Sequence, residues 1–286
     1  MSSPLDTGQT TDRPHLTDQS HADARAVEAL LFTRPSAPRI DHHLLGGQAV
    51  YDLDRQAGNT LVRAVPGIRD MVRARRAFVT RCARRFAEEG LDQFLDLGCG
   101  LPTGHDVHHV VHAVDPAARV LYVDHDPIVL QHAWAHLSGP GVEVVTADVR
   151  DTRLLLAALH DEGMLDLRRP VAVLLAGVLD FVADHELPAV LTGLRKSLAP
   201  GSRLALTHLC ADRLTTAEAT ALTEVHARTQ TPLRPRGRTA IGALFTGFVL
   251  DEPGLVELYP WGPDEGVWPV ANSFVLGGLA TLRHPA

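Results

Sequence analysis

Three aspartates stand at the ends of successive apolar runs that have the composition of buried strands. Asp96 lies in "QFLDLGCG", Asp124 ends "RVLYVD" and Asp148 ends "VEVVTAD". Ligands of open parallel sheets bind beyond the carboxyl ends of the strands, so three such carboxylates can line one site. A carboxylate can accept from two ribose hydroxyls, as we expect of Asp124, and Asp148 is placed to accept from an adenine amino group. Each aspartate taken alone could instead cap the following helix.

The stretch "DLGCGLPTG" forms a glycine-rich corner after the first of these runs. Gly98 and Gly100 permit tight turning and let a ligand approach the backbone closely. A phosphate-binding loop needs GxGxxG opening directly into a helix. Here Thr103 occupies the place of the third glycine and Pro102 interrupts the helical entry. The corner therefore suits a nucleoside without a pyrophosphate better than a dinucleotide, and an NAD-linked dehydrogenase is disfavoured.

Glycines and carboxylates together favour a nucleoside that carries positive charge, and S-adenosylmethionine is such a nucleoside. We expect Cys99 to serve the site through packing or its backbone, because no histidine partner for a nucleophilic thiol is implied. The predicted cofactor site consists of the three aspartates, the two glycines and the residues beside them: Asp96, Gly98, Cys99, Gly100, Asp124, His125, Asp148 and Val149.

Methyl transfer from a sulfonium requires alignment of the acceptor and exclusion of water, and a base only where the acceptor must lose a proton. Asp180 follows the apolar run "VAVLLAG" and could act as a base or bind an acceptor amine; it could equally cap a helix. His208 in "RLALTHL" is a second candidate base, although a lone histidine on an apolar strand is more often part of the core.

Tyr51, with His42 and His43, lies in a segment that could fold over the cofactor as a lid or simply form a surface loop. Arg75 could clamp a carboxylate of the substrate through two hydrogen bonds, or belong to an arginine-rich helix surface. The predicted catalytic residues are thus Asp180, His208 and Tyr51, and the predicted substrate-binding residues are Arg75 and Asp180. No metal is predicted, because the histidines from His105 to His112 form a helical stripe without a second ligand cluster.

These residues require an α/β fold to position them. Strand-like runs alternate with helical patterns from about residue 93, which predicts five parallel strands covered on both faces. "LVELY" and "SFVLGGLATL" predict a terminal antiparallel hairpin at the sheet's edge. The preceding segment has helical periodicity. We expect a disordered tail at 1–25, a helical cap at 26–90 and a nucleoside-binding domain at 91–286.

Composition limits the partners. The 286 residues carry a formal charge of −7, and the only long basic run, residues 69–90, has the spacing of a solvated helix face, so we expect no nucleic-acid partner. No apolar run has the length of a bilayer span and the polar start lacks a secretory pattern, so no membrane partner is expected. Three unpaired-looking cysteines favour a cytoplasmic protein. The apolar run "FVLGGLATL" could belong to an internal strand or to an interface, so a homo-oligomer is possible.

The order "FLDLGCGLPT", "VLYVDHDPIVL", "VVTADVRD", "LLAGVLDFVAD" and "LAPGSRLALTHL", preceded by "LLGG" and "VPGIRDMVRARRAFV", resembles the actinobacterial S-adenosyl methyltransferase family, the DUF574 group. The resemblance runs from about Arg39 to the C-terminus. It implies a class I methyltransferase fold, a Rossmann-like seven-stranded sheet of order 3-2-1-4-5-7-6 with strand 7 antiparallel. It also implies S-adenosylmethionine as the cofactor and places Asp124 at the ribose and Asp148 beside the adenine.

Departures from the family pattern fall on the acceptor side. Gln48, Ala49 and Val50 replace Lys, Asp and Asn, Arg75 replaces Asn, and Asp180 stands where His is usual. We therefore expect a methyltransferase acting on its own small-molecule substrate, plausibly in bacterial specialised metabolism. The alternatives are another use of the same cofactor (cyclisation, elimination or aminocarboxypropyl transfer) and a non-catalytic cofactor sensor or scaffold.

Overall fold

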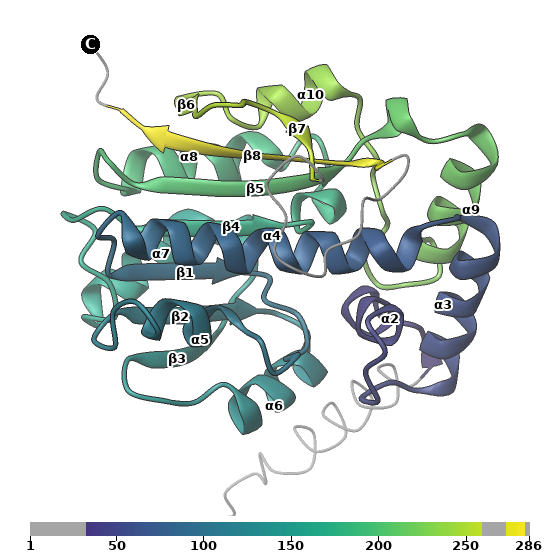
Figure 1. Ribbon diagram of the computed structural model, residues 1–286, viewed down its shortest axis with the longest axis horizontal. Coiled ribbons are helices and arrows are strands. Elements are labelled where there is room, and N and C mark those ends of the chain that lie inside the picture. Colours follow the sequence, from purple (N-terminus) through teal and green to yellow (C-terminus); the bar gives the residue numbers. More distant parts are fainter. Residues whose placement is uncertain (1–32, 259–272, 284–286) are drawn as a thin grey trace, which may run out of the picture. The chain divides into compact units, whose positions relative to one another are not determined.

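A mixed β-sheet forms the centre of the computed structural model, which describes residues 33–258 and 273–283. Its order is β3-β2-β1-β4-β5-β8-β6, with β7 paired to β8. β1 to β5 are parallel, and β8 runs antiparallel to both β5 and β6 (Figure 1). The strands are β1 Gln93–Leu97, β2 Arg119–Asp124, β3 Val142–Thr146, β4 Ala172–Ala176, β5 Arg203–Leu209, β6 Phe248–Leu250, β7 Val256–Glu257 and β8 Val275–Leu282. The predicted fold class and antiparallel strand are confirmed.

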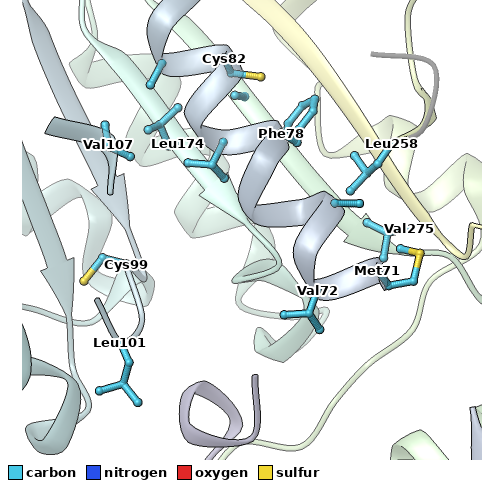
Figure 2. Packing of buried hydrophobic residues seen from close by; sticks show 14 of the residues in the cluster. Met71, Val72, Phe78, Cys82, Cys99, Leu101, Val107, Leu174, Leu258 and Val275 are labelled. Atoms are coloured by element: carbon cyan, nitrogen blue, oxygen red, sulfur yellow. The ribbon is translucent and has the colours of Figure 1, made fainter. Parts of the chain in front are cut away.

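Helices cover both faces of the sheet because successive strand side chains point to opposite sides. Phe94 of β1 belongs to the core beneath α4 (Ile68–Glu88), α5 (Val107–His112) and α6 (Pro127–His136). Leu95, the next residue, belongs to the core beneath α7 (Thr152–Asp161), α8 (Leu187–Ser197) and α10 (Arg238–Ala243). Figure 2 shows how α4 contributes to the first core, with Met71, Phe78 and Cys82 beside the strand residues Leu174 and Val275.

The C-terminal strands differ in part from the prediction. The edge position next to β8 is taken by β6, a three-residue strand that no sequence pattern singled out, because an apolar run this short has no readable period. "LVELY" supplies only the two-residue β7. β8 consequently lies inside the sheet, between β5 and β6, and not in a hairpin at its edge.

The N-terminal helices pack around the carboxyl end of the sheet. α2 (Ala37–Leu44) contacts α3 (Asp52–Ala64) and α4, and α3 contacts α9 (Thr216–His226). The described residues from position 34 onward, 34–258 and 273–283, belong to one compact unit, so these helices belong with the sheet. His42 and His43, which the sequence left in a lid or a surface loop, belong to α2: the chain turns into a helix after Ser36, with Pro38 in the first turn, where proline is tolerated.

Part of the predicted domain organisation falls on residues that the structure does not describe. The predicted tail, residues 1–25, and the first turns of the predicted cap lie outside the described residues. Within the described ranges, no helix is both long enough and apolar enough to cross a bilayer.

Candidate functional site

A cavity opens at the carboxyl ends of β1 to β4, and α2 and α4 form its other wall. All eight residues predicted to bind the cofactor line it, and so does the predicted substrate-binding residue Arg75. The cavity wall carries five carboxylates, those of Asp41, Asp96, Asp124, Asp126 and Asp148, against three guanidiniums, those of Arg75, Arg76 and Arg150. This excess of carboxylates favours a cationic ligand.

The glycine corner is attached directly to the end of β2. The amides of Gly98 and Cys99 both donate to the carbonyl oxygen of Val123, at 2.7 and 3.1 Å. Gly98 has a φ of +71°, and a Cβ added there would lie 2.4 Å from Cγ2 of Val178. Only glycine fits this position without strain, and the tight corner leaves room for a ligand above the ends of the strands.

A carboxylate of the protein occupies the backbone amides of the corner that a phosphate would need. Asp106, at the start of α5, accepts from the amides of Thr103 and Gly104, each at 3.1 Å. In a phosphate-binding loop such amides would point at the ligand. Here these amides already donate to Asp106. This agrees with the spacing of the glycines, which does not match a loop that binds pyrophosphate.

Asp124 joins the corner to β2. Its Oδ2 accepts from the Gly100 amide at 3.0 Å, and its Oδ1 accepts from the amides of His125 and Asp126 at 2.8 and 3.0 Å. Burial raises the pKa of this carboxyl, and the amides of Asp126 and Gly100 oppose that shift. Two carboxylate oxygens offer about four acceptor positions, so at Oδ2 a further donor such as a ribose hydroxyl can be accommodated.

Asp148, at the end of the segment after β3, is held by its neighbour Arg150. The Arg150 side chain donates to both carboxylate oxygens, and its amide donates to Oδ1 at 2.9 Å. Burial alone would raise the pKa of Asp148, but these hydrogen bonds outweigh it and hold the pKa below its ordinary value. An ionised, partly engaged carboxylate can still orient a donor at this end of the cavity.

Asp96 lies one residue before the end of β1, lines the cavity and is 4% exposed. Burial raises its pKa to about 7, and the carboxylates of Asp106 and Asp124 add to the shift while Arg76 opposes it. Within residues 33–258 and 273–283 we find no hydrogen bond to its side chain. A cation placed beside Asp96 would therefore relieve an unfavourable buried charge.

Arg75 of α4 stands where β4 ends. Its NH2 group donates to Asp41 of α2, and its NH1 group lies 3.7 Å from Oδ2 of Asp180. A Cβ added at Gly177 would lie 2.3 Å from NH1, so the absence of a side chain at Gly177 lets the guanidinium cross the end of β4. Both terminal nitrogens of Arg75 thus face carboxylates of the protein itself.

The three residues predicted to be catalytic do not reach the cavity wall. Asp180 is 2% exposed and lies behind Arg75, with its Oδ1 accepting from the Leu209 amide and lying 2.9 Å from Nδ1 of His208. His208 is fully buried and does not line the cavity, and its Nε2 lies beside Arg236. Tyr51 instead begins α3, where its ring packs under the guanidinium of Arg39.

Asp180 and His208 are paired as in a catalytic triad, but Nε2 of the histidine faces Arg236 and not the cavity. NH1 of Arg236 lies 2.8 Å from Nε2 of His208. A guanidinium can only donate, so Nε2 accepts, and Nδ1 carries the proton toward Asp180. Burial alone would raise the pKa of Asp180, but His208 and Arg75 outweigh it and lower the pKa. The pair therefore fixes the side chains behind the cavity.

The sequence placed His42 in a possible lid but did not single out the other residues of α2 that line the cavity. Pro38, Asp41, His42 and Leu45 all line the cavity, and they recur at i, i+3, i+4 and i+7. This is the spacing of one helix face, and together with the helix-starting pattern at Ser36 it was a readable signal. Gln230 and Thr231, from the segment after α9, also line the cavity and carried no such signal.

Comparisons with known proteins agree with this geometry. Residues 23–283 match the model of the family described as S-adenosyl methyltransferase. A provisionally assigned methyltransferase from Thermobifida fusca YX has a crystal structure that is 34% identical, covering 88% of this chain and 97% of that one with a TM-score of 0.81. A DUF574 family protein from Streptomyces avermitilis MA-4680 is 31% identical, covering 89% and 99% with a TM-score of 0.81.

Solved structures of lower sequence identity support the fold alone. A SAM-dependent methyltransferase from Anabaena variabilis ATCC 29413 shares 15% identity, covering 80% of this chain and 93% of that one with a TM-score of 0.52. No curated protein matches the chain. From the match over residues 23–283 and the two relatives above 30% identity, the chain belongs to the S-adenosyl methyltransferase family, whose members are S-adenosylmethionine-dependent enzymes.

Proposed function

We propose that this methyltransferase binds S-adenosylmethionine across the carboxyl ends of β3, β2 and β1 and methylates a small molecule that enters beside β4. One observation carries the proposal: Asp148, Asp124 and Asp96 line a single cavity in the order of their strands. Neighbouring strands lie about 4.8 Å apart, so the three carboxylates form a row along which an extended nucleoside can lie.

The residues of the cavity fit such a ligand. Asp124 keeps acceptor capacity for a ribose hydroxyl, and Asp148 with Val149 would border the adenine. The amino-acid arm would lie over Gly98 and Gly100, with its ammonium near Asp96. When bound, S-adenosylmethionine supplies a methyl group made electrophilic by a positively charged sulfur. The surplus of carboxylates on the wall favours this cation over a nucleoside that carries phosphate.

The enclosure of the cavity supports a small acceptor. The hydroxyl of Ser36, just before α2, donates to Asp126 of the opposite wall at 2.8 Å. The buried Asp54 accepts from the Ser36 amide at 3.0 Å and so fixes the start of α2. A wall held at its start by these two contacts would help to exclude water from methyl transfer and would suit a small molecule better than a polymer.

The cellular setting is the most distant part of the proposal. We place the protein in the cytoplasm of an actinobacterium, in specialised metabolism. The similar structures from Thermobifida fusca and Streptomyces avermitilis support the source, and the three cysteines, all free and buried, support a reducing compartment.

Calorimetric titration tests the cofactor assignment. We expect the protein to bind S-adenosylmethionine and S-adenosylhomocysteine but not NAD, and Asp124→Ala to weaken binding by about 10- to 100-fold, the loss of one or two charged hydrogen bonds. Asp161→Ala, at the end of α7 and outside the cavity, is the matched control. Equal affinity of Asp124→Ala and the unchanged protein would refute the assignment. Formation of methylthioadenosine in place of S-adenosylhomocysteine would indicate non-methyl chemistry.

A further inference from the structure

We infer that Asp41 of α2 holds the acceptor of the methyl group, and that the acceptor presents an amine nitrogen there. The inference rests on the proposed function, because it assumes that the nucleoside lies along β3, β2 and β1. It assigns to α2 a role that sequence analysis gave to the residue after β4, Asp180.

The position of Asp41 supports this role. Its side chain is 35% exposed and lines the cavity, whereas that of Asp180 is 2% exposed and does not. Asp41 is paired with Arg75, whose guanidinium crosses Gly177 at the end of β4. β4 is the neighbour of β1 on the side away from β2. Asp41 and Arg75 therefore lie beyond the glycine corner, at the end of the row opposite Asp148, the adenine-side acid.

The charges at this end of the cavity select the kind of acceptor. Arg75 is shared between the carboxylates of Asp41 and Asp180, so the group has one negative charge in excess. Burial alone would lower the pKa of His208, and the Asp180 carboxylate raises it. Because Nε2 must accept from Arg236, which is itself paired with Asp184, the ring stays neutral and adds no charge that would balance the excess. An acceptor carboxylate would be repelled. An ammonium would be attracted, and the neutral amine formed when it loses a proton would keep the carboxylate as a hydrogen-bond acceptor.

A neighbouring histidine leaves this balance unchanged. His226 is 5% exposed, and its Nδ1 lies 2.8 Å from the carbonyl oxygen of Leu222, so Nδ1 carries the proton of the neutral ring. Burial lowers its pKa, with Arg75 acting in the same direction and Asp41 and Asp180 opposing. His226 is therefore neutral at pH 7, and the negative excess of the Asp41, Arg75 and Asp180 group remains.

The chemistry of methyl transfer favours nitrogen at this position. An amine reacts as the neutral base, after an ammonium proton has passed to solvent, because the nitrogen lone pair must form the new N–C bond. The S–C bond then breaks with its electron pair left on sulfur. The positive charge moves to nitrogen, which keeps its protons until they pass to solvent. A carboxylate beside the nitrogen stabilises the charge as it develops. An alcohol would instead have to give up its proton to a base, and the Asp41 carboxylate already accepts from Arg75.

Sinefungin tests the inference without knowledge of the acceptor, because a carbon-bound amine takes the place of the sulfonium methyl in this analogue. We expect Asp41→Asn to weaken sinefungin binding by about tenfold in calorimetry, the loss of one charge-assisted contact, and to change S-adenosylhomocysteine binding by less than about twofold. Asp70→Asn is the matched control, since Asp70 pairs with Arg73 on the exposed face of α4.

Three other outcomes would overturn the inference, and they are distinguishable. If Asp41→Asn binds both nucleosides as the unchanged protein does, Asp41 does not face the methyl position. If it loses S-adenosylhomocysteine as well, its role lies in the fold or in cofactor binding. If the unchanged protein binds neither nucleoside, the proposed function fails and the inference fails with it.

Discussion

Arg39 and Asp54 form a buried ion pair, with Nε of Arg39 2.9 Å from Oδ2 of Asp54 and neither side chain more than 2% exposed. Asp54 also accepts from the amides of Ser36 and Tyr51, at 3.0 and 2.9 Å. One carboxylate of α3 thereby fixes the start of α2 and the end of the segment that follows α2. Since α2 forms one wall of the cavity, a structural ion pair outside the site decides the shape of the site.

We expect the Asp54→Ala variant to unfold more readily than the unchanged protein. Asp54→Ala leaves the Arg39 guanidinium buried without this partner, and such a loss costs about 3–5 kcal/mol of unfolding free energy. Asp52→Ala removes an exposed acid that pairs with Arg55 on the same helix, and should cost less than about 1 kcal/mol. Urea denaturation followed by circular dichroism measures both. Equal midpoints for the two variants would contradict the role given to Asp54.

The glycine corner offers a prediction with an internal control. Gly98 and Gly104 both have positive φ, +71° and +82°, but only Gly98 has a neighbour within reach of an added Cβ. Gly104→Ala should therefore cost about 1 kcal/mol from backbone strain alone, and Gly98→Ala about 1–3 kcal/mol more from the contact with Val178. Thermal unfolding compares them. A Gly98→Ala variant as stable as Gly104→Ala would show that the corner is less tightly packed than described.

The raised pKa of Asp96 predicts that the stability of the protein depends on pH. Its pKa is about 7 in the folded protein because of burial, against about 4 in an unfolded chain. The folded state thus binds the proton more tightly. This carboxyl contributes stability that is fully present below about pH 4 and lost as pH rises through about 7. Denaturation of the ligand-free protein should show Asp96→Asn gaining stability, relative to the unchanged protein, between pH 5 and pH 8.

The control for this prediction is Asp115→Asn, which changes an acid in the turn between α5 and β2, outside the cavity. Its stability relative to the unchanged protein should not vary over the same range of pH. If Asp96→Asn behaves in the same way as the control, the carboxyl of Asp96 is not the buried, unfavourably charged group described here.

Much of the site could be predicted from sequence because it depends on short-range patterns. Alternation of apolar runs with helical periods determined the parallel sheet. The ends of the runs determined where Asp96, Asp124 and Asp148 would stand, since parallel strands present their carboxyl ends at one edge. The turn residues Gly98 and Gly100 marked the corner. All eight residues of the predicted cofactor site line the observed cavity for this reason.

The acceptor side depended on contacts that no local pattern carries. Arg75 meets Asp41 across 34 positions of sequence, and Asp180 meets His208 across 28, so neither pairing has a period or spacing to read. The sequence placed Asp180 and His208 at the correct strand ends. Which way their side chains face was decided by the tertiary structure, because the Arg75 and Arg236 guanidiniums pack against them and α2 brings Asp41 to the wall instead.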